Sequence, residues 1–150
     1  MTYRIAICDD EPEQVQALKA VVDAWGKENR VRCAVACFPS AEAFWFAYEA
    51  DPVCDILLLD VEMPGMSGMD LARRLRAAGS RLEIVFITSH FEFVSEGYEV
   101  DARHYLVKPV AGEKLCTVLS RAAEILAEEP PFVVFSCEGE TVKLYEAEVL

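Results

Sequence analysis

The chain has 150 residues, of which 53% are hydrophobic, and this length suffices for one substantial core but not for two domains of ordinary size. Its formal net charge of −12 excludes a surface built to neutralise nucleic-acid phosphates, which requires clustered Lys and Arg. Because no signal peptide and no membrane-spanning run of apolar residues is apparent, we expect a soluble, cytoplasmic protein without membrane contact. The six scattered cysteines are interpreted as reduced packing residues.

The first part of the chain predicts strands that alternate with helices. Residues 3–8 form a short apolar run, and residues 11–29 carry their apolar side chains on one helical face. Residues 31–37 predict a second strand, which we expect to be covered on both faces because Ala34 and Ala36 are also apolar. Ser40 is placed to cap a second helix. The uniformly apolar run 56–59 predicts a central parallel strand that ends at Asp60.

The same alternation continues after a loop at residues 63–68. A helix from Met69 should end at Gly79, and a strand over residues 84–87 should follow it. The pattern then predicts a short helix over 91–100, a strand over 104–107 and a last helix over 113–128. Five such β-α units predict an α/β fold of the flavodoxin-like type, with a five-stranded parallel sheet and helices on both faces. Ligands of such sheets bind at the carboxyl ends of the strands.

The chain changes character at Pro130 and Pro131, which cannot continue a helix. The runs 132–135 and 141–145, with Gly139 between them, predict a β-hairpin that turns near residues 137–140. We therefore expect a domain over residues 1–128, a linker over 129–131 and a β-hairpin extension over 132–150. Because an isolated two-stranded hairpin is marginally stable in water, we expect its apolar residues to contact a neighbour, such as a second subunit.

Five polar residues follow the predicted strands and should meet at one edge of the sheet: Asp9, Asp10, Asp60, Thr88 and Lys108. A single acid at a strand end is usually solvated, and Asp9 and Asp10 could simply cap the first helix. Three carboxylates held together repel one another, however, and Mg²⁺ is the usual remedy. A carboxylate nucleophile beside a cation, a lysine and a hydroxyl is suited to phosphoryl transfer.

At this point the segments ICDDE, DILLLDVEMPGMSG, FITSH and YLVKP resemble, in order, the signature segments of the response regulator receiver family. The likeness covers roughly residues 3–127. It implies a two-component signalling domain, not a classical enzyme, that accepts a phosphoryl group from a histidine kinase and assists its own phosphorylation and dephosphorylation. The site residues that the resemblance implies are Asp60 as the phosphoacceptor; Asp9, Asp10, Asp60 and the backbone carbonyl of Glu62 as Mg²⁺ ligands; Thr88 and Lys108 at the phosphoryl oxygens; Tyr105 as an aromatic that changes rotamer with Thr88; and Pro109 as a cis-proline.

The segment 132–150 resembles the opening strands of a LytTR-type DNA-binding domain. This likeness implies transcription regulation, with DNA contacts made only by an output domain missing from this chain, and a chain truncated early in that domain. The alternative is a natural stand-alone receiver that acts through protein contacts. Residues 91–100 carry more apolar side chains than one buried face requires, which indicates either a helix covered by the tail or a homodimer or output surface.

Two enzyme-like alternatives fit the sequence less well. A phosphatase of the haloacid-dehalogenase type would require a second Asp two residues after the nucleophile, where this chain has Glu62. A flavin-binding flavodoxin would require a phosphate-binding loop after the first strand, where Asp9, Asp10 and Glu11 would repel a phosphate.

Overall fold

The computed structural model describes residues 2–89, 100, 102–128, 132–137 and 140–145. The chain divides into two compact units, Met1–Leu119 and Ser120–Leu150, and the division falls within the last helix. The predicted short helix 91–100 lies outside the described residues, except for Val100.

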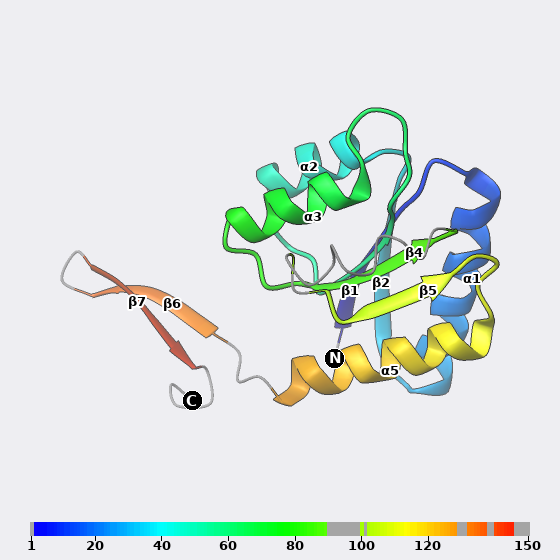
Figure 1. Cartoon of the computed structure of the whole chain (residues 1–150). Coiled ribbons are helices and arrows are strands. Elements are labelled where there is room, and N and C mark those ends of the chain that lie inside the picture. Colours follow the sequence, from blue (N-terminus) through cyan, green and yellow to red (C-terminus); the bar gives the residue numbers. More distant parts are fainter. Residues whose placement is uncertain (1, 90–99, 101, 129–131, 138–139, 146–150) are drawn as a thin grey trace. The chain divides into compact units, whose positions relative to one another are not determined.

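The first unit contains a five-stranded parallel sheet with the order β2-β1-β3-β4-β5, which confirms the predicted flavodoxin-like α/β fold (Figure 1). Every residue of β3 and β4 is buried. This explains the uniformly apolar runs 56–59 of β3 and 84–87 of β4, each of which precedes the polar residue that ends its strand. The bounds of the five strands are β1 Thr2–Cys8, β2 Arg32–Phe38, β3 Ile56–Asp60, β4 Glu83–Thr88 and β5 His104–Val107.

Helices cover both faces of this sheet. Helices α2 and α3 lie side by side on one face, and α1 lies on the other (Figure 1). The hydroxyls of Ser40 and Ser67 cap α2 and α3 by accepting hydrogen bonds of 3.0 and 3.1 Å from backbone N–H groups of the first turn. Gly79, with a φ of +84°, follows the end of α3 in a conformation that favours glycine. The bounds of the described helices are α1 Pro12–Glu28, α2 Ala41–Ala50, α3 Gly68–Ala77 and α5 Gly112–Glu128.

The expectation that the second strand is covered on both faces is wrong. Strand β2 pairs with β1 alone and forms one edge of the sheet. Its residues alternate between half-buried and exposed, and Ala34 and Ala36 are among the exposed ones. Cys37 is exposed as well, so it is not a packing residue. The small apolar side chains at these positions therefore do not indicate a second covering layer.

The second unit includes β6 (Phe132–Cys137) and β7 (Glu140–Tyr145), which pair in the antiparallel sense. The pairing runs from Phe132 with Tyr145 to Cys137 with Glu140. The proposed domain boundary at residues 129–131 stays a prediction.

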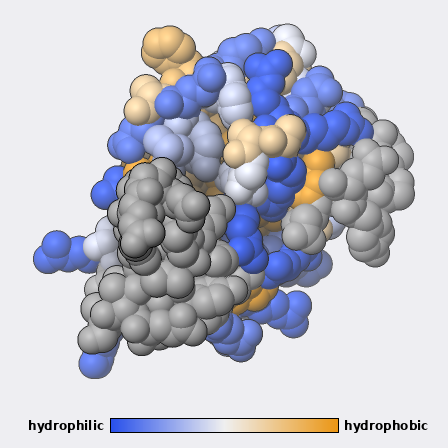
Figure 2. Space-filling model, turned by 90° about the vertical axis from the view of Figure 1, so that its left-hand side faces the viewer, coloured by the Kyte–Doolittle hydropathy of each residue, from blue (hydrophilic) through white to orange (hydrophobic). Residues whose placement is uncertain are grey.

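The surface of the described residues is largely polar. Figure 2 shows hydrophilic side chains over most of the coloured part of one face, with apolar ones scattered among them. The exposed large hydrophobic residues are Phe46, Val53 and Val107. None of the described helices combines the length and the apolar character that crossing a membrane requires.

Candidate functional site

The register of the sheet brings the predicted polar residues to one edge. Cys8 is level with Leu59, Asp60 with Ile87, and Thr88 with Val107. The residues that end or follow these strands are therefore neighbours at the carboxyl end of the sheet, as the alternation of strands and helices predicts.

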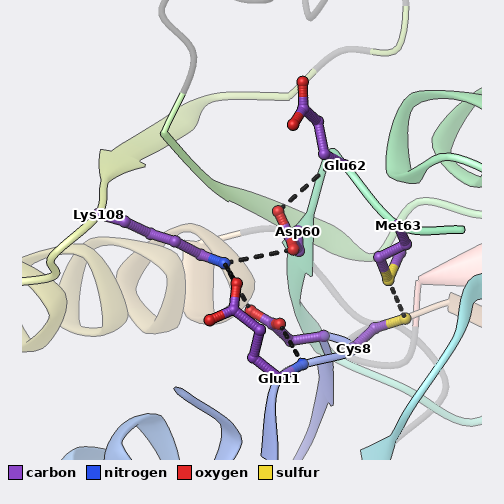
Figure 3. Close-up of polar contacts among 7 residues, drawn as sticks. Cys8, Glu11, Asp60, Glu62, Met63 and Lys108 are labelled. Carbon is purple, nitrogen blue, oxygen red and sulfur yellow. Dashed lines mark hydrogen bonds and ion pairs between the residues drawn. The ribbon is translucent and has the colours of Figure 1, made fainter. Parts of the chain in front are cut away.

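The Lys108 ammonium lies among three carboxylates (Figure 3). Its Nζ is 3.1 Å from Asp9 Oδ2, 3.3 Å from Asp60 Oδ2 and 3.4 Å from Glu11 Oε1. The side chains of Asp9 and Asp60 are 1% and 5% exposed, and that of Lys108 is 13% exposed. These three side chains form a largely buried cluster of charged groups, in which electrostatic interactions are stronger than in water.

Burial and charge shift the protonation of this cluster. Desolvation, together with the charge of Asp9, raises the pKa of Asp60 to about 6 and outweighs the opposing effect of Lys108. Burial opposes the charged form of Lys108, but the close contact with Asp9 and the charges of Asp60 and Asp9 outweigh it and raise the pKa of the ammonium. With its pKa at about 6, Asp60 is a carboxylate that loses its proton at a higher pH than an ordinary aspartate, next to a lysine that stays charged.

Asp9 has one oxygen engaged with the backbone and one directed to the cluster. Its Oδ1 accepts a hydrogen bond of 2.9 Å from the backbone N–H of Glu11, and its own N–H donates to the Phe38 carbonyl over 3.1 Å. Its Oδ2 is buried and accepts no hydrogen bond of good geometry, although Lys108 is close. A buried carboxylate oxygen without a hydrogen bond is costly, and a cation would satisfy it.

The donor set fits a hard divalent cation. Asp9, Asp10, Glu11 and Asp60 each offer a carboxylate oxygen, and these four atoms lie within 4.8 Å of one another. Mg²⁺ prefers oxygen ligands and is commonly held by one or two carboxylates, with other positions left to water. Because Asp10 and Glu11 are exposed and Asp9 and Asp60 are buried, the cluster opens to solvent on one side. The residues of this chain therefore suit the Mg²⁺ that the sequence predicts.

The loop after β3 holds Asp60 through the backbone. The Glu62 N–H donates to Asp60 Oδ1 over 3.3 Å, and the Gly68 N–H donates to the Val61 carbonyl over 2.9 Å. Gly68 packs so tightly that an added Cβ would collide with the Asp60 carbonyl oxygen. The Glu62 carboxylate is exposed and points away from Asp60, which does not suit the acid or base of a phosphatase (Figure 3).

Thr88 lies on β4, the strand next to Asp60, and Tyr105 lies on β5, one strand further along the sheet. Thr88 ends β4 with 2% of its surface exposed, and its carbonyl accepts a hydrogen bond of 3.0 Å from the Lys108 N–H. The peptide bond between Lys108 and Pro109 is cis. The half-buried Tyr105 ring stacks on Phe86, with a centroid distance of 5.5 Å.

Sequence reasoning missed two residues of this site. Glu11 had no assigned role, although it follows directly after Asp9 and Asp10 and its carboxylate reaches Lys108. Gly68 was read only as part of a loop, whereas it starts α3 in contact with the backbone of Asp60. The adjacency in the sequence could have indicated Glu11, whereas no local signal distinguishes Gly68 from an ordinary loop glycine.

Comparison with known proteins gives matches over most of the first unit. The family described as "Response regulator receiver domain" matches residues 5–120. The positive alginate biosynthesis regulatory protein of Pseudomonas aeruginosa is 44% identical over 123 residues, which are 79% of this chain and 46% of that protein. The sensory transduction protein LytT of Enterococcus faecalis is 28% identical over 127 residues, which are 85% of this chain and 50% of that protein. The chain thus spans about half the length of these relatives.

Solved structures support the fold. A response regulator receiver domain protein from Clostridium thermocellum aligns with a TM-score of 0.73 at 22% identity, over 83% of this chain and 97% of that one. The chemotaxis protein CheY4 of Vibrio cholerae aligns with a TM-score of 0.71 at 22% identity, over 81% of this chain and 99% of that one. At this identity the likeness concerns the fold alone.

Proposed function

The chain belongs to the response regulator receiver family, and from this premise we propose that Asp60 accepts a phosphoryl group from a histidine kinase in a Mg²⁺-dependent reaction. The observation that carries the proposal is the buried Asp60 carboxylate, which lies at the carboxyl end of the central strand within 3.3 Å of the Lys108 ammonium. The phosphorylated state would then switch an output step.

The transfer is a displacement at phosphorus. One carboxylate oxygen of Asp60 attacks, a new O–P bond forms, and the P–N bond to the kinase histidine breaks, so that the imidazole leaves with the electron pair of that bond. Asp60 must be ionised to attack. With a pKa of about 6, it is largely ionised near pH 7.5.

The remaining residues serve the charge of the phosphoryl group. Lys108 is held in the charged form by Asp9 and Asp60, and we propose that its ammonium binds a phosphoryl oxygen. The Thr88 hydroxyl would donate a hydrogen bond to another phosphoryl oxygen, and Tyr105 would change rotamer as Thr88 moves. Asp9, Asp10, Asp60 and the Glu62 carbonyl would hold the Mg²⁺, which when bound neutralises charge on the transferred group.

For the output we propose transcription regulation through a LytTR-type domain, which would make the DNA contacts. This rests on the resemblance of the segment 132–150 to the start of such a domain and on the likeness to response regulators that include a LytT protein. We also propose that phosphorylation promotes a homodimer. Residues 91–100, for which the sequence indicates either a helix covered by the tail or a dimer or output surface, lie outside the described residues apart from Val100. Analytical ultracentrifugation of the phosphorylated and unphosphorylated chain would test the dimer.

The deciding experiment is incubation with Mg²⁺ and acetyl phosphate, followed by intact mass measurement. We expect the wild-type chain to gain one acid-labile phosphoryl group and Asp60→Asn to gain none. Asp51→Asn is the matched control, because Asp51 is exposed and follows α2 at the end away from the site. Absence of the gain in the wild type, or an equal gain in Asp60→Asn, would refute the proposal. Asp10→Ala should lower both the affinity for Mg²⁺ and the rate of phosphorylation.

A further inference from the structure

The three carboxylates that surround Lys108 differ in their access to water. Asp9 and Asp60 are buried, whereas the Glu11 side chain is 66% exposed. The distances from Nζ are nevertheless similar, at 3.1, 3.3 and 3.4 Å. Lys108 thus has two partners inside the cluster and one at its rim.

The two inner partners are also the carboxylates that a cation would need. With its ammonium between them, Lys108 satisfies part of the charge that the cation would otherwise balance. Because like charges repel, the Lys108 ammonium must move away from Asp9 and Asp60 before both carboxylates can bind a divalent cation. Its side chain is largely buried, and an ammonium that withdraws without another partner would be left partly desolvated.

The backbone of Glu11 is held by hydrogen bonds, whereas its side chain has no part in capping the helix. Its N–H donates to Asp9 Oδ1 over 2.9 Å, and its carbonyl accepts the first hydrogen bond of α1, from Val15, over 3.0 Å. Its side chain makes no capping hydrogen bond, although Glu11 occupies the N-cap position of α1. The carboxylate can therefore follow the ammonium at little cost to the helix.

We propose that Glu11 is a positioning residue that accepts the Lys108 ammonium when Asp9 and Asp60 turn to a divalent cation. The inference rests on the proposed function, because it concerns the same Mg²⁺-dependent site. It assigns Glu11 an effect on cation affinity that acts through Lys108 and not through direct contact with the ion.

A double-mutant cycle tests this assignment, with Mg²⁺ alone as the probe and calorimetric titration as the measurement. Glu11→Gln is introduced into the wild type and into two backgrounds, Lys108→Met and Lys108→Gln, so that the result does not depend on the folding of one variant. Glu13→Gln is the matched control, because Glu13 is exposed in the first turn of the same helix. Thermal unfolding without Mg²⁺ checks that each variant is folded.

We expect Glu11→Gln to weaken Mg²⁺ binding about three- to fivefold when Lys108 is present, the size of a partly exposed ion pair. The factor should fall to that of Glu13→Gln in both Lys108 backgrounds. An equal factor with and without Lys108 would overturn the inference, because Glu11 would then act on the cation directly. Undetectable Mg²⁺ binding by the wild-type chain would overturn it too. Phosphorylation of Asp60 is scored separately by mass, so a failure of the proposed function remains distinguishable.

Discussion

The raised pKa of Asp60 predicts an unusual dependence of stability on pH. The pKa is about 6 in the folded chain, against an ordinary value of 3.8 for an aspartate side chain. An acid with a raised folded pKa binds its proton more tightly when folded, so its contribution to stability is complete below the unfolded pKa and is lost as the pH rises through the folded value. Asp60→Asn removes this titration while keeping the shape of the side chain.

The magnitude follows from the two pKa values. Between pH 7.5 and pH 5, protonation of Asp60 should stabilise the folded chain by about 1 kcal/mol, and by about 2 kcal/mol at pH 4. Other groups titrate in the same range, but they are shared by the wild type and Asp60→Asn. The difference in the free energy of unfolding between the two proteins should therefore move by these amounts in favour of the wild type as the pH falls.

Urea unfolding at pH 7.5, 6.5, 5.5 and 5.0, in the absence of Mg²⁺, measures this difference. We expect Asp60→Asn to be the more stable protein at pH 7.5, because it lacks the buried charge, and to lose that advantage at low pH. Stability curves that run parallel over this range would refute the reasoning, since Asp60 would then have an ordinary pKa.

Three further predictions concern the supports of the site. Lys108→Met should lower the free energy of unfolding by about 2 kcal/mol without Mg²⁺, because two buried carboxylates lose their cation, and Mg²⁺ should stabilise this variant more than the wild type. Gly68→Ala should cost about 3 kcal/mol and slow phosphorylation, because the added Cβ collides with the Asp60 carbonyl. Ser67→Ala should cost about 1 kcal/mol through the lost cap of α3, with the rate of phosphorylation unchanged.

Chemical denaturation measures all three changes, and acetyl phosphate labelling measures the rates. Gly112→Ala is the control for the glycine variant, because a Cβ there would meet only an ordinary contact of 3.8 Å with Val21. Equal costs for the two glycine variants would contradict the close approach at Gly68. A Lys108→Met variant as stable as the wild type would show that the carboxylates are balanced by other means.

The sequence predicted the features that depend on local pattern. The uniform apolar run of β3 identified a central strand, and its position before Asp60 placed that residue at the correct edge of the sheet. The exposure of β2 could not be predicted, because amino-acid composition does not reveal that this strand lies at the edge of the sheet, with β1 as its one neighbour among the described strands. The contacts of Glu11 and Gly68 were missed for a related reason. The Glu11 side chain reaches Lys108 from a distant part of the chain, and the approach of Gly68 to the Asp60 backbone depends on the path of the loop between them, which local pattern does not reveal.

The excess of carboxylates over ammonium at this edge of the sheet also bears on where a phosphoryl group can come from. Four acidic side chains gather there with Lys108 among them. A small phosphorylated metabolite is itself an anion, so it approaches against a repulsive field that a Debye length of roughly 10 Å does not screen at close range. A donor carried on a folded protein can offset this repulsion with contacts made elsewhere on the surface. If Asp60 is the phosphoacceptor, this edge should favour a docked protein donor, and labelling by a free metabolite such as acetyl phosphate should require Mg²⁺ and a high concentration of the metabolite.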